Sequence, residues 1–274
     1  MKAYIRKPVI AGSWYPGNPE VLKQNIDDFL KQAVIAEIPR KPVAIISPHA
    51  GYQYSGQVAA YAYKAIAGHA YSTVVVISPS HRMYLPFVSV WKSGAFETPL
   101  GALEVDEAFC EKLMAASGVF TDDTRPHVSE HALEIQLPFL QVVLGNFRLC
   151  PLIMGLQEPD ACRELARALH RSIDDPDDVL IVASSDLSHF HPASRAEAMD
   201  ARVAQAVERF DVDGLSRDLE RSECEACGGG PILSALMYAQ ALSRTNSRVL
   251  KYAHSGHITG DNLSVVGYLS AVIW

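Results

Sequence analysis

Short runs rich in valine and isoleucine alternate with helical patterns along most of the chain. This alternation is typical of a sheet whose strands are joined by crossover helices. It predicts an α/β fold with a mixed, largely parallel central sheet flanked by helices. The expected strands are residues 43–47, 73–78, 87–91, 148–154, 179–184, 248–253 and 263–273. The expected helices are residues 20–34, 55–66, 106–116, 130–144, 159–172, 193–209 and 231–242.

The length and composition of the chain favour one large domain and restrict its partners. Its 274 residues, 49% of them hydrophobic, can bury a full core. No internal repeat, low-complexity tract or long linker divides the sequence, so we expect a single domain over residues 1–274. The formal net charge is −7 and no lysine or arginine run is present, which argues against a nucleic-acid partner.

Nothing in the sequence indicates export or a membrane span. No stretch approaches the roughly 20 apolar residues of a membrane-spanning helix, and charged residues interrupt the N-terminus where a signal peptide has its apolar core. We therefore expect a cytoplasmic protein without a membrane partner. The five cysteines, an odd number, do not resemble a disulfide framework. The single CxxC, at Cys224 and Cys227, is a weak signal for structural zinc, which usually takes four ligands.

Three of the expected strands end in polar clusters. "VAIIS" runs into "PHAGY" at His49, "TVVVIS" runs into "PSHR" at His81, and "VLIVAS" runs into "SDLSHFH", which contains Asp186 and His189. In an open α/β sheet, the loops that leave the carboxyl ends of the strands form the ligand crevice. We therefore expect these side chains to gather at one edge of the sheet.

His49 and His81 are the strongest candidates for metal ligands. They end consecutive strands separated by one helix, so both strands should run in the same direction. If the two strands are neighbours, their ends lie about 4.8 Å apart, within reach of one ion. Neutral imidazole is a common metal ligand. The alternative is that each histidine is a hydrogen-bonded turn residue.

Other residues complete the candidate site. Asp186 and His189, three residues apart in a turn, can form a hydrogen bond that orients the histidine for acid or base catalysis. His131 and Glu134 share one helix face and either contact a substrate or join the helix to a loop. Cys227 precedes a helix whose N-terminus favours a thiolate, so it is either a third metal ligand or a packed thiol.

Six separated motifs, in this order from residue 11 to residue 232, resemble the MEMO family, which comprises the cell-motility mediator of animals and its bacterial and archaeal relatives. The motifs are "AGSWYPG", "PHAGYQYSGQVAAYAYK", "SPSH", "EHALEIQLPFL", "SSDLSHF" and "CGGGPI". Prokaryotic members are often called AmmeMemoRadiSam system protein B. The resemblance covers nearly the whole chain. It implies a fold like that of the LigB-type non-haem iron extradiol dioxygenases, with a metal pocket at the ends of the strands.

The resemblance also implies roles for the candidate residues. It makes His49, His81 and Cys227 the metal ligands, and it places Asp186, His189 and His131 around the pocket as the catalytic set. The implied cofactor is a redox metal ion, iron or copper, and the sulfur ligand also makes zinc possible. The implied partners are a small-molecule or peptide ligand and, from the family context, AMMECR-type and radical-SAM proteins.

These observations leave three functional hypotheses. The first is a metal-dependent oxidoreductase, dioxygenase-like, or a component of a radical-SAM-associated modification pathway. The second is a non-catalytic module that binds a small ligand or a (phospho)peptide in the same pocket. The third is metal-assisted hydrolysis with Glu134 or Asp186 as general base. His254 and His257, near the end of a late strand, receive no role from the sequence.

Overall fold

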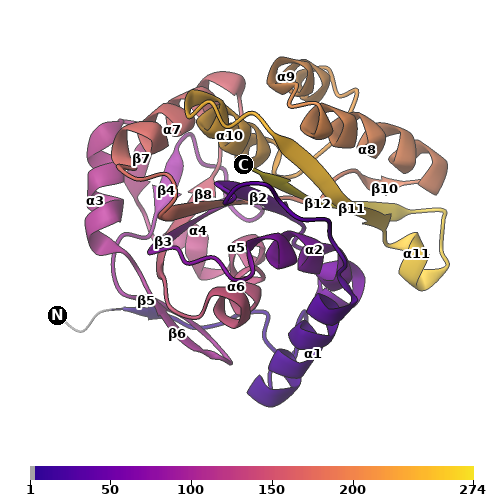
Figure 1. Ribbon diagram of the computed structural model, residues 1–274, viewed down its shortest axis with the longest axis horizontal. Coiled ribbons are helices and arrows are strands. Elements are labelled where there is room, and N and C mark those ends of the chain that lie inside the picture. Colours follow the sequence, from indigo (N-terminus) through magenta and orange to yellow (C-terminus); the bar gives the residue numbers. More distant parts are fainter. Residues whose placement is uncertain (1–3) are drawn as a thin grey trace.

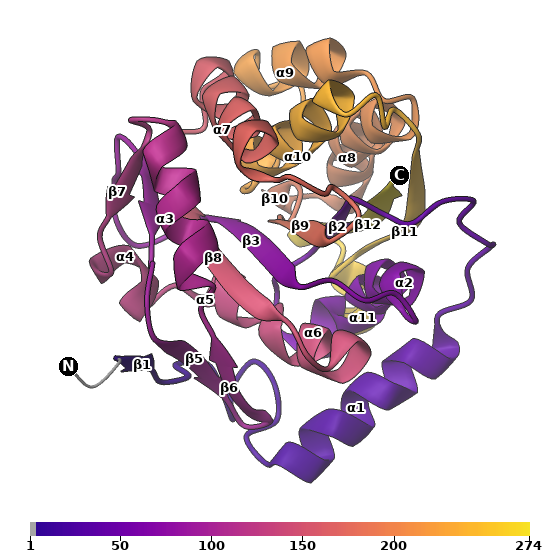
Figure 2. The same cartoon turned by 60° about the vertical axis from the view of Figure 1, so that its left-hand side comes forward.

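The computed structural model describes residues 4–274, which are built around a nine-stranded sheet with helices on both faces (Figures 1 and 2). Four strands in the middle of this sheet are mutually parallel, in the order β2 (Ala44–Ser47), β9 (Val179–Ser184), β3 (Thr73–Pro79) and β8 (Arg148–Met154). All residues of β2, β3 and β9 are buried. Continuous apolar strands of this kind are typical of parallel sheets that are covered on both faces.

The flanks of the sheet are largely antiparallel. On one side, β12 (Val265–Ile273) pairs with β2 and also with β10 (His189–His191) and β11 (Ser247–His254), all in antiparallel fashion. On the other side, β4 (Val88–Val90) is antiparallel to β8 and parallel to β7 (Phe120–Asp122). A separate small sheet contains β1 (Ile5–Arg6), β5 (Ala95–Thr98) and β6 (Gly101–Glu104). The predicted mixed α/β fold is confirmed, and its parallel order is concentrated in the central strands.

Helices cover both faces of the sheet, as Figure 2 shows. One face carries α7 (Pro159–Ser172), α8 (Ala193–Glu208), α9 (Val212–Glu220) and α10 (Gly229–Ala241). The other carries α1 (Pro19–Gln32), α2 (Gln57–Ile66) and α6 (Leu137–Leu144). The remaining helices are α3 (Glu107–Ala116), which packs against α7 and β8, and the single turns α4 (Arg125–Val128), α5 (His131–Glu134) and α11 (Gly256–Thr259). Within residues 4–274, no helix has both the length and the apolar character needed to cross a membrane.

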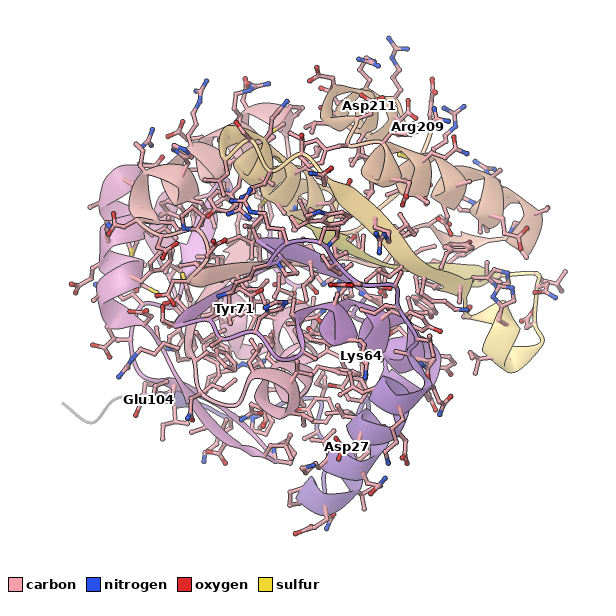
Figure 3. The ribbon with its side chains drawn as sticks, in the orientation of Figure 1. Asp27, Lys64, Tyr71, Glu104, Arg209 and Asp211 are labelled. Atoms are coloured by element: carbon pink, nitrogen blue, oxygen red, sulfur yellow. The ribbon has the colours of Figure 1, made fainter. Side chains whose placement is uncertain are left out.

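Charged side chains lie on the outside of these helices and strands, and aliphatic side chains with some aromatic ones fill the inside (Figure 3). Figure 3 labels Lys64 on α2 and Glu104 on β6, both exposed, and Tyr71, which is buried. The Tyr71 hydroxyl donates a hydrogen bond of 2.9 Å to the carbonyl of Pro42. A buried tyrosine normally finds such a partner for its hydroxyl.

The seven expected strands are all present, and two expected helices differ in detail. The helix predicted over residues 130–144 is divided into α5 and α6, because Pro138 lacks an N–H group and its ring clashes with a continuous helical backbone. The helix predicted from Ser55 begins instead with a π-helical turn, Tyr52–Gly56. Ser55 does not cap that helix, since its hydroxyl donates to the carbonyl of Ala50. The short strands β1, β5, β6, β7 and β10 and the helices α4, α9 and α11 were not predicted.

The strands that carry His49 and His81 are parallel, as predicted, but they are not neighbours. Strand β9 lies between β2 and β3 and pairs with both in parallel fashion. The carboxyl ends of all three strands therefore meet at one edge of the sheet, with Asp186 just beyond the middle one. The two histidines approach each other across the end of β9.

The N-terminal segment is held on the main body by Glu134, which is fully buried. Its carboxylate pairs with the guanidinium of Arg6 and accepts hydrogen bonds from the backbone N–H groups of Val9 and Ile10 and from the hydroxyl of Tyr15, the last at 2.7 Å. Of the two roles left open for Glu134, the structure supports the one that joins the helix to a loop. The side chain of Arg6 is also nearly fully buried, with 3% exposed.

We expect Glu134→Gln to lower the free energy of unfolding by about 3–5 kcal/mol, because the substitution leaves the buried guanidinium of Arg6 without its counter-charge. Urea denaturation followed by circular dichroism measures the change. The matched control is Glu104→Gln, whose partner Arg148 and own side chain are both largely exposed. That change should cost no more than about 1 kcal/mol. Equal effects of the two substitutions would contradict the role assigned to Glu134.

Candidate metal-binding site

A cavity of about 790 Å³ opens at the carboxyl ends of β2, β9 and β3. Its wall contains five of the six residues proposed for the site from the sequence: His49, His81, His131, Asp186 and His189. The sixth, Cys227, touches His49 from behind that wall, with its Sγ 3.0 Å from Nε2 of the histidine. The structure therefore brings all six predicted residues into one region, although the group of close donor atoms consists of His49, His81 and His131 and does not include Cys227.

The hydrogen bonds of Ser184 determine which nitrogen of His49 is free. The Ser184 hydroxyl donates its single hydrogen to the carbonyl of Ala132, at 2.7 Å. It must therefore act as acceptor toward the His49 Nδ1, which lies 3.0 Å away. The proton of the neutral imidazole is consequently on Nδ1, and Nε2 has a free lone pair. A metal-binding histidine usually has this arrangement, with its second nitrogen donating to an oxygen.

Gln136 fixes the position of Ser184 from the other side. Its amide nitrogen donates to the Ser184 hydroxyl at 2.8 Å and to the carbonyl of Pro48 at 3.0 Å. Its amide oxygen accepts from the hydroxyl of Tyr63 at 2.6 Å. Gln136, Ser184 and Tyr63 are all buried. The sequence analysis did not identify these supporting residues, although Ser184 and Gln136 lie within two of the quoted motifs.

Glu130 orients His81 in the same way. Its carboxylate accepts from the backbone N–H of His81 at 2.7 Å and lies 2.9 Å from the His81 Nδ1. A carboxylate at this position keeps the proton on Nδ1 and leaves Nε2 available. Burial alone would raise the pKa of Glu130, but the hydrogen bonds from His81 and from the backbone N–H of Ala132 outweigh it and lower that pKa. Glu130 therefore remains an anion, and it too was missed in the sequence.

His131 completes a group of three imidazoles. One ring nitrogen from each of His49, His81 and His131 lies within 4.8 Å of the other two. The Nδ1 of His131 is buried and has no hydrogen-bond partner among the described residues, although a Glu130 oxygen lies 3.3 Å away in an unsuitable direction. The ring of Trp14 lies against His131, with 4.4 Å between ring centroids. An unpartnered buried nitrogen beside two oriented imidazoles fits a site that accepts a cation.

Cys227 is held against the end of β9 by its own loop. Its backbone N–H donates to the carbonyl of Asp186 at 3.2 Å, and the N–H of Gly228 donates to the Ser185 hydroxyl at 3.0 Å. A side chain at position 228 would meet the carbonyl oxygen of Ser184 at 2.2 Å, so glycine is required there. The missing side chain at Gly228 thus lets the loop of Cys227 approach the end of β9 closely.

Two expectations about these side chains differ from the structure. No hydrogen bond joins Asp186 to His189 in the described part of the chain, because the His189 Nδ1 contacts the carbonyl of Leu187 at 2.8 Å. Asp186 instead accepts from the backbone N–H of His49 at 2.7 Å. The thiolate expected at Cys227 is also disfavoured. Removal from solvent and the nearby Asp186 raise the pKa of this thiol well above its usual value.

His49 and His131 are neutral donors before any cation binds. Burial lowers the pKa of His49 well below its usual value and also lowers the pKa of His131. Neutral imidazole is the form that binds metal ions, so protons do not compete strongly at these two residues. Imidazole nitrogens with a nearby sulfur suit zinc, copper or iron better than magnesium or calcium.

A third buried imidazole, His127, makes the stability of the fold depend on pH. Burial lowers its pKa from 6.5 to about 3, so the unfolded chain binds a proton below pH 6.5 that the folded chain does not. The stability from neutral His127 is complete above pH 6.5 and is lost as the pH falls toward 3.

We therefore expect His127→Gln to flatten the dependence of the unfolding free energy on pH between 6.5 and 4. The difference in slope from the wild type should approach about 1.4 kcal/mol per pH unit, the value for one proton. Urea denaturation at several pH values measures it. His170→Gln, on the exposed side of α7, serves as control and should keep the wild-type slope. Parallel curves for His127→Gln and the wild type would rule out this linkage.

Comparison with known proteins gives a consistent match. The family model described as "Memo-like protein" matches residues 6–272. A protein of Thermotoga neapolitana, described as a MEMO1 family protein, is 38% identical over 279 aligned positions that cover 98% of this chain and 99% of the relative. MEMO1 family proteins of Sulfolobus acidocaldarius and Methanobrevibacter smithii are each 36% identical, over 97% and 98% of this chain and 98% and 99% of their own lengths.

Proposed function

This chain belongs to the Memo-like family, and on that basis we propose that it is a metal-dependent redox enzyme. The metal would be held by His49, His81 and Cys227, with His131 beside them. The observation that carries this proposal is the orientation of His49 and His81. Each imidazole is held through Nδ1 by a buried oxygen, and a thiol lies 3.0 Å from the Nε2 of His49.

The family resemblance implies iron or copper, and the soft sulfur donor shifts the preference toward copper or zinc. When bound, such an ion would supply open coordination positions at which an oxidant and a substrate can be activated. Binding also requires Cys227 to lose its proton, which the nearby cation would favour. The free His49 Nε2 is already the acceptor closest to that thiol.

The other residues of the cavity have roles that follow from their contacts. His189 keeps its proton on Nδ1, through the contact with the carbonyl of Leu187, so Nε2 is free to accept a proton from a substrate. Asp186 holds the loop that carries His49 and so positions that ligand. Trp14 covers His131 and excludes water from one side of the cluster.

Metal-assisted hydrolysis receives less support. That reaction needs a carboxylate that is free to activate water beside the ion. Glu134 is fully buried and engaged with Arg6, Tyr15 and two backbone N–H groups. Asp186 is engaged with the backbone N–H of His49. Glu134 therefore has no carboxylate oxygen available for water, and only Asp186 Oδ2, 4.0 Å from the His49 Nε2, is left for that role.

A non-catalytic binding module is the second candidate, and the aromatic lining of the cavity favours it. Trp14, Tyr54, Phe190 and Tyr268 all contribute to its wall. Cavities of a few hundred Å³ with aromatic walls are typical of ligand sites. In this case the same cavity would bind a small molecule or a peptide without transforming it. Cooperation with radical-SAM and AMMECR-type proteins remains a prediction from the family context.

We expect His49→Ala and Cys227→Ser each to retain one metal ion fewer than the wild type after anaerobic purification. The physical reason is that each substitution removes one of three donors to the same ion. Mass spectrometry of the bound metal gives the stoichiometry. His170→Ala is the matched control, since this histidine is exposed on α7. Unchanged metal content in both site variants would refute the ligand assignment. Loss of the metal ion in His131→Ala but not in Cys227→Ser would show that the third ligand is the imidazole of His131.

We expect His189→Gln to keep its metal but to lower turnover by about 10²–10⁴-fold, because a proton-transfer group is removed while the ligands remain. Oxygen consumption by the metal-loaded protein with catechols, or with a reductant, measures turnover. If the metal-loaded wild type consumes no oxygen with catechols or with a reductant, the redox proposal fails. Saturable ligand binding that His81→Ala weakens would then support the binding module.

A further inference from the structure

A second group of metal-binding side chains lies outside the candidate site. It contains Glu197 on α8, His254 at the end of β11 and His257 on α11, the elements on the right of Figure 1. One donor atom from each residue lies within 4.8 Å of the other two. His254 is buried, whereas Glu197 and His257 are exposed. The group is therefore exposed to solvent at Glu197 and His257 and buried at His254.

The two imidazoles are held close together by the backbone. Their rings are stacked, with 3.7 Å between centroids and an interplanar angle of 24°. The backbone N–H of His254 donates to the His257 Nδ1 at 3.2 Å. Position 256, between them, must be glycine, since a side chain there would meet Asn262 Oδ1 at 2.5 Å and His254 Nδ1 at 2.9 Å. Two protonated imidazoles at this distance would repel each other. The stacked pair therefore favours a shared counter-charge or a shared cation over protonation of both rings.

His254 has one nitrogen in contact with Glu197 and one without a partner. Its Nε2 lies 3.3 Å from a carboxylate oxygen of Glu197. Its Nδ1 is buried and has no hydrogen-bond partner in residues 4–274. A cation that replaced the proton between Nε2 and Glu197 would move that proton to Nδ1. The carbonyl of Asp261 and the side-chain oxygen of Asn262 lie near Gly256, as does this Nδ1.

We propose that Glu197, His254 and His257 form a second metal site, specific for a divalent ion of the zinc type. Two imidazoles and one carboxylate are a common donor set for Zn²⁺ with an open fourth position. This site goes beyond the proposed function, since it shares no ligand with the cluster at His49 and His81. Binding through either nitrogen of His257 costs the hydrogen bond from the His254 N–H, because Nδ1 would then hold either the ion or the ring proton. His257 is exposed on a single-turn helix, where the loss of one such bond is tolerated.

The second site is connected to the cavity through the segment that carries His257. Ser255 and Thr259, on either side of that histidine, line the cavity, as do Asp261 and Ser264 beyond it. A zinc ion between α8 and α11 therefore ties this wall of the cavity to the body of the protein. Its binding should protect the backbone of residues 255–264 from exchange with solvent.

The test is zinc titration of metal-free protein by calorimetry, in a His49→Ala background that disables the first site. We expect one zinc ion to bind in this background. Adding Glu197→Gln or His257→Ala should weaken binding at least tenfold, and both residues are exposed, so the variants should fold. Adding His170→Ala, an exposed histidine on α7, should change nothing. Equal zinc affinity in all four proteins overturns the proposal.

Hydrogen exchange provides a second readout that does not depend on activity. In the His49→Ala background, zinc should slow amide exchange over residues 255–264, and it should not do so when His257→Ala is also present. Equal protection in both proteins also overturns the proposal. Because the first site is disabled throughout, failure here leaves the function proposed for His49, His81 and Cys227 untouched.

Discussion

The candidate site depends on one hydrogen bond, the one that His49 Nδ1 donates to the hydroxyl of Ser184. The direction of this bond is fixed because the hydroxyl gives its own hydrogen to the carbonyl of Ala132 and accepts from Gln136. Were the hydroxyl free to rotate, either nitrogen of His49 could carry the proton. The buried surroundings of Ser184 remove that freedom, and they turn an ordinary histidine at the end of a strand into an oriented donor.

The same bond links the fold to the site, because Ser184 is the last residue of β9 and His49 follows β2. The two strands are paired in register, with Ser47 opposite Ser184. Strand β9 also separates β2 from β3, so the loops rather than adjacent backbones bring His49 and His81 together, with 5.1 Å between ring centroids. Parallel pairing of three strands therefore sets the position of the donors, and the polar residues that follow each strand set their direction.

The sequence predicted the residues of the site better than their hydrogen bonds. His49, His81 and Asp186 were identified because each follows an apolar strand. A run of apolar residues is a local signal that the sequence shows directly. Strand order is not local, so the position of β9 between β2 and β3 was missed. The partnership of Glu130 with His81 joins residues 49 positions apart, and no local pattern predicts it. The expected hydrogen bond between Asp186 and His189 does not form, because the His189 Nδ1 contacts the carbonyl of Leu187 instead.

The low polarity around His49 has opposite consequences for the imidazoles and for the thiol. Burial keeps the imidazole of His49 neutral and ready to bind, but it also keeps Cys227 protonated. A cation reverses only the second effect, since a nearby positive charge stabilises a thiolate and repels an imidazolium. His49 therefore resists protonation, and under the proposed function Cys227 would become a thiolate donor only when a metal ion binds. Under the function proposed here, a site with this property would favour metal ions that bind thiolate strongly.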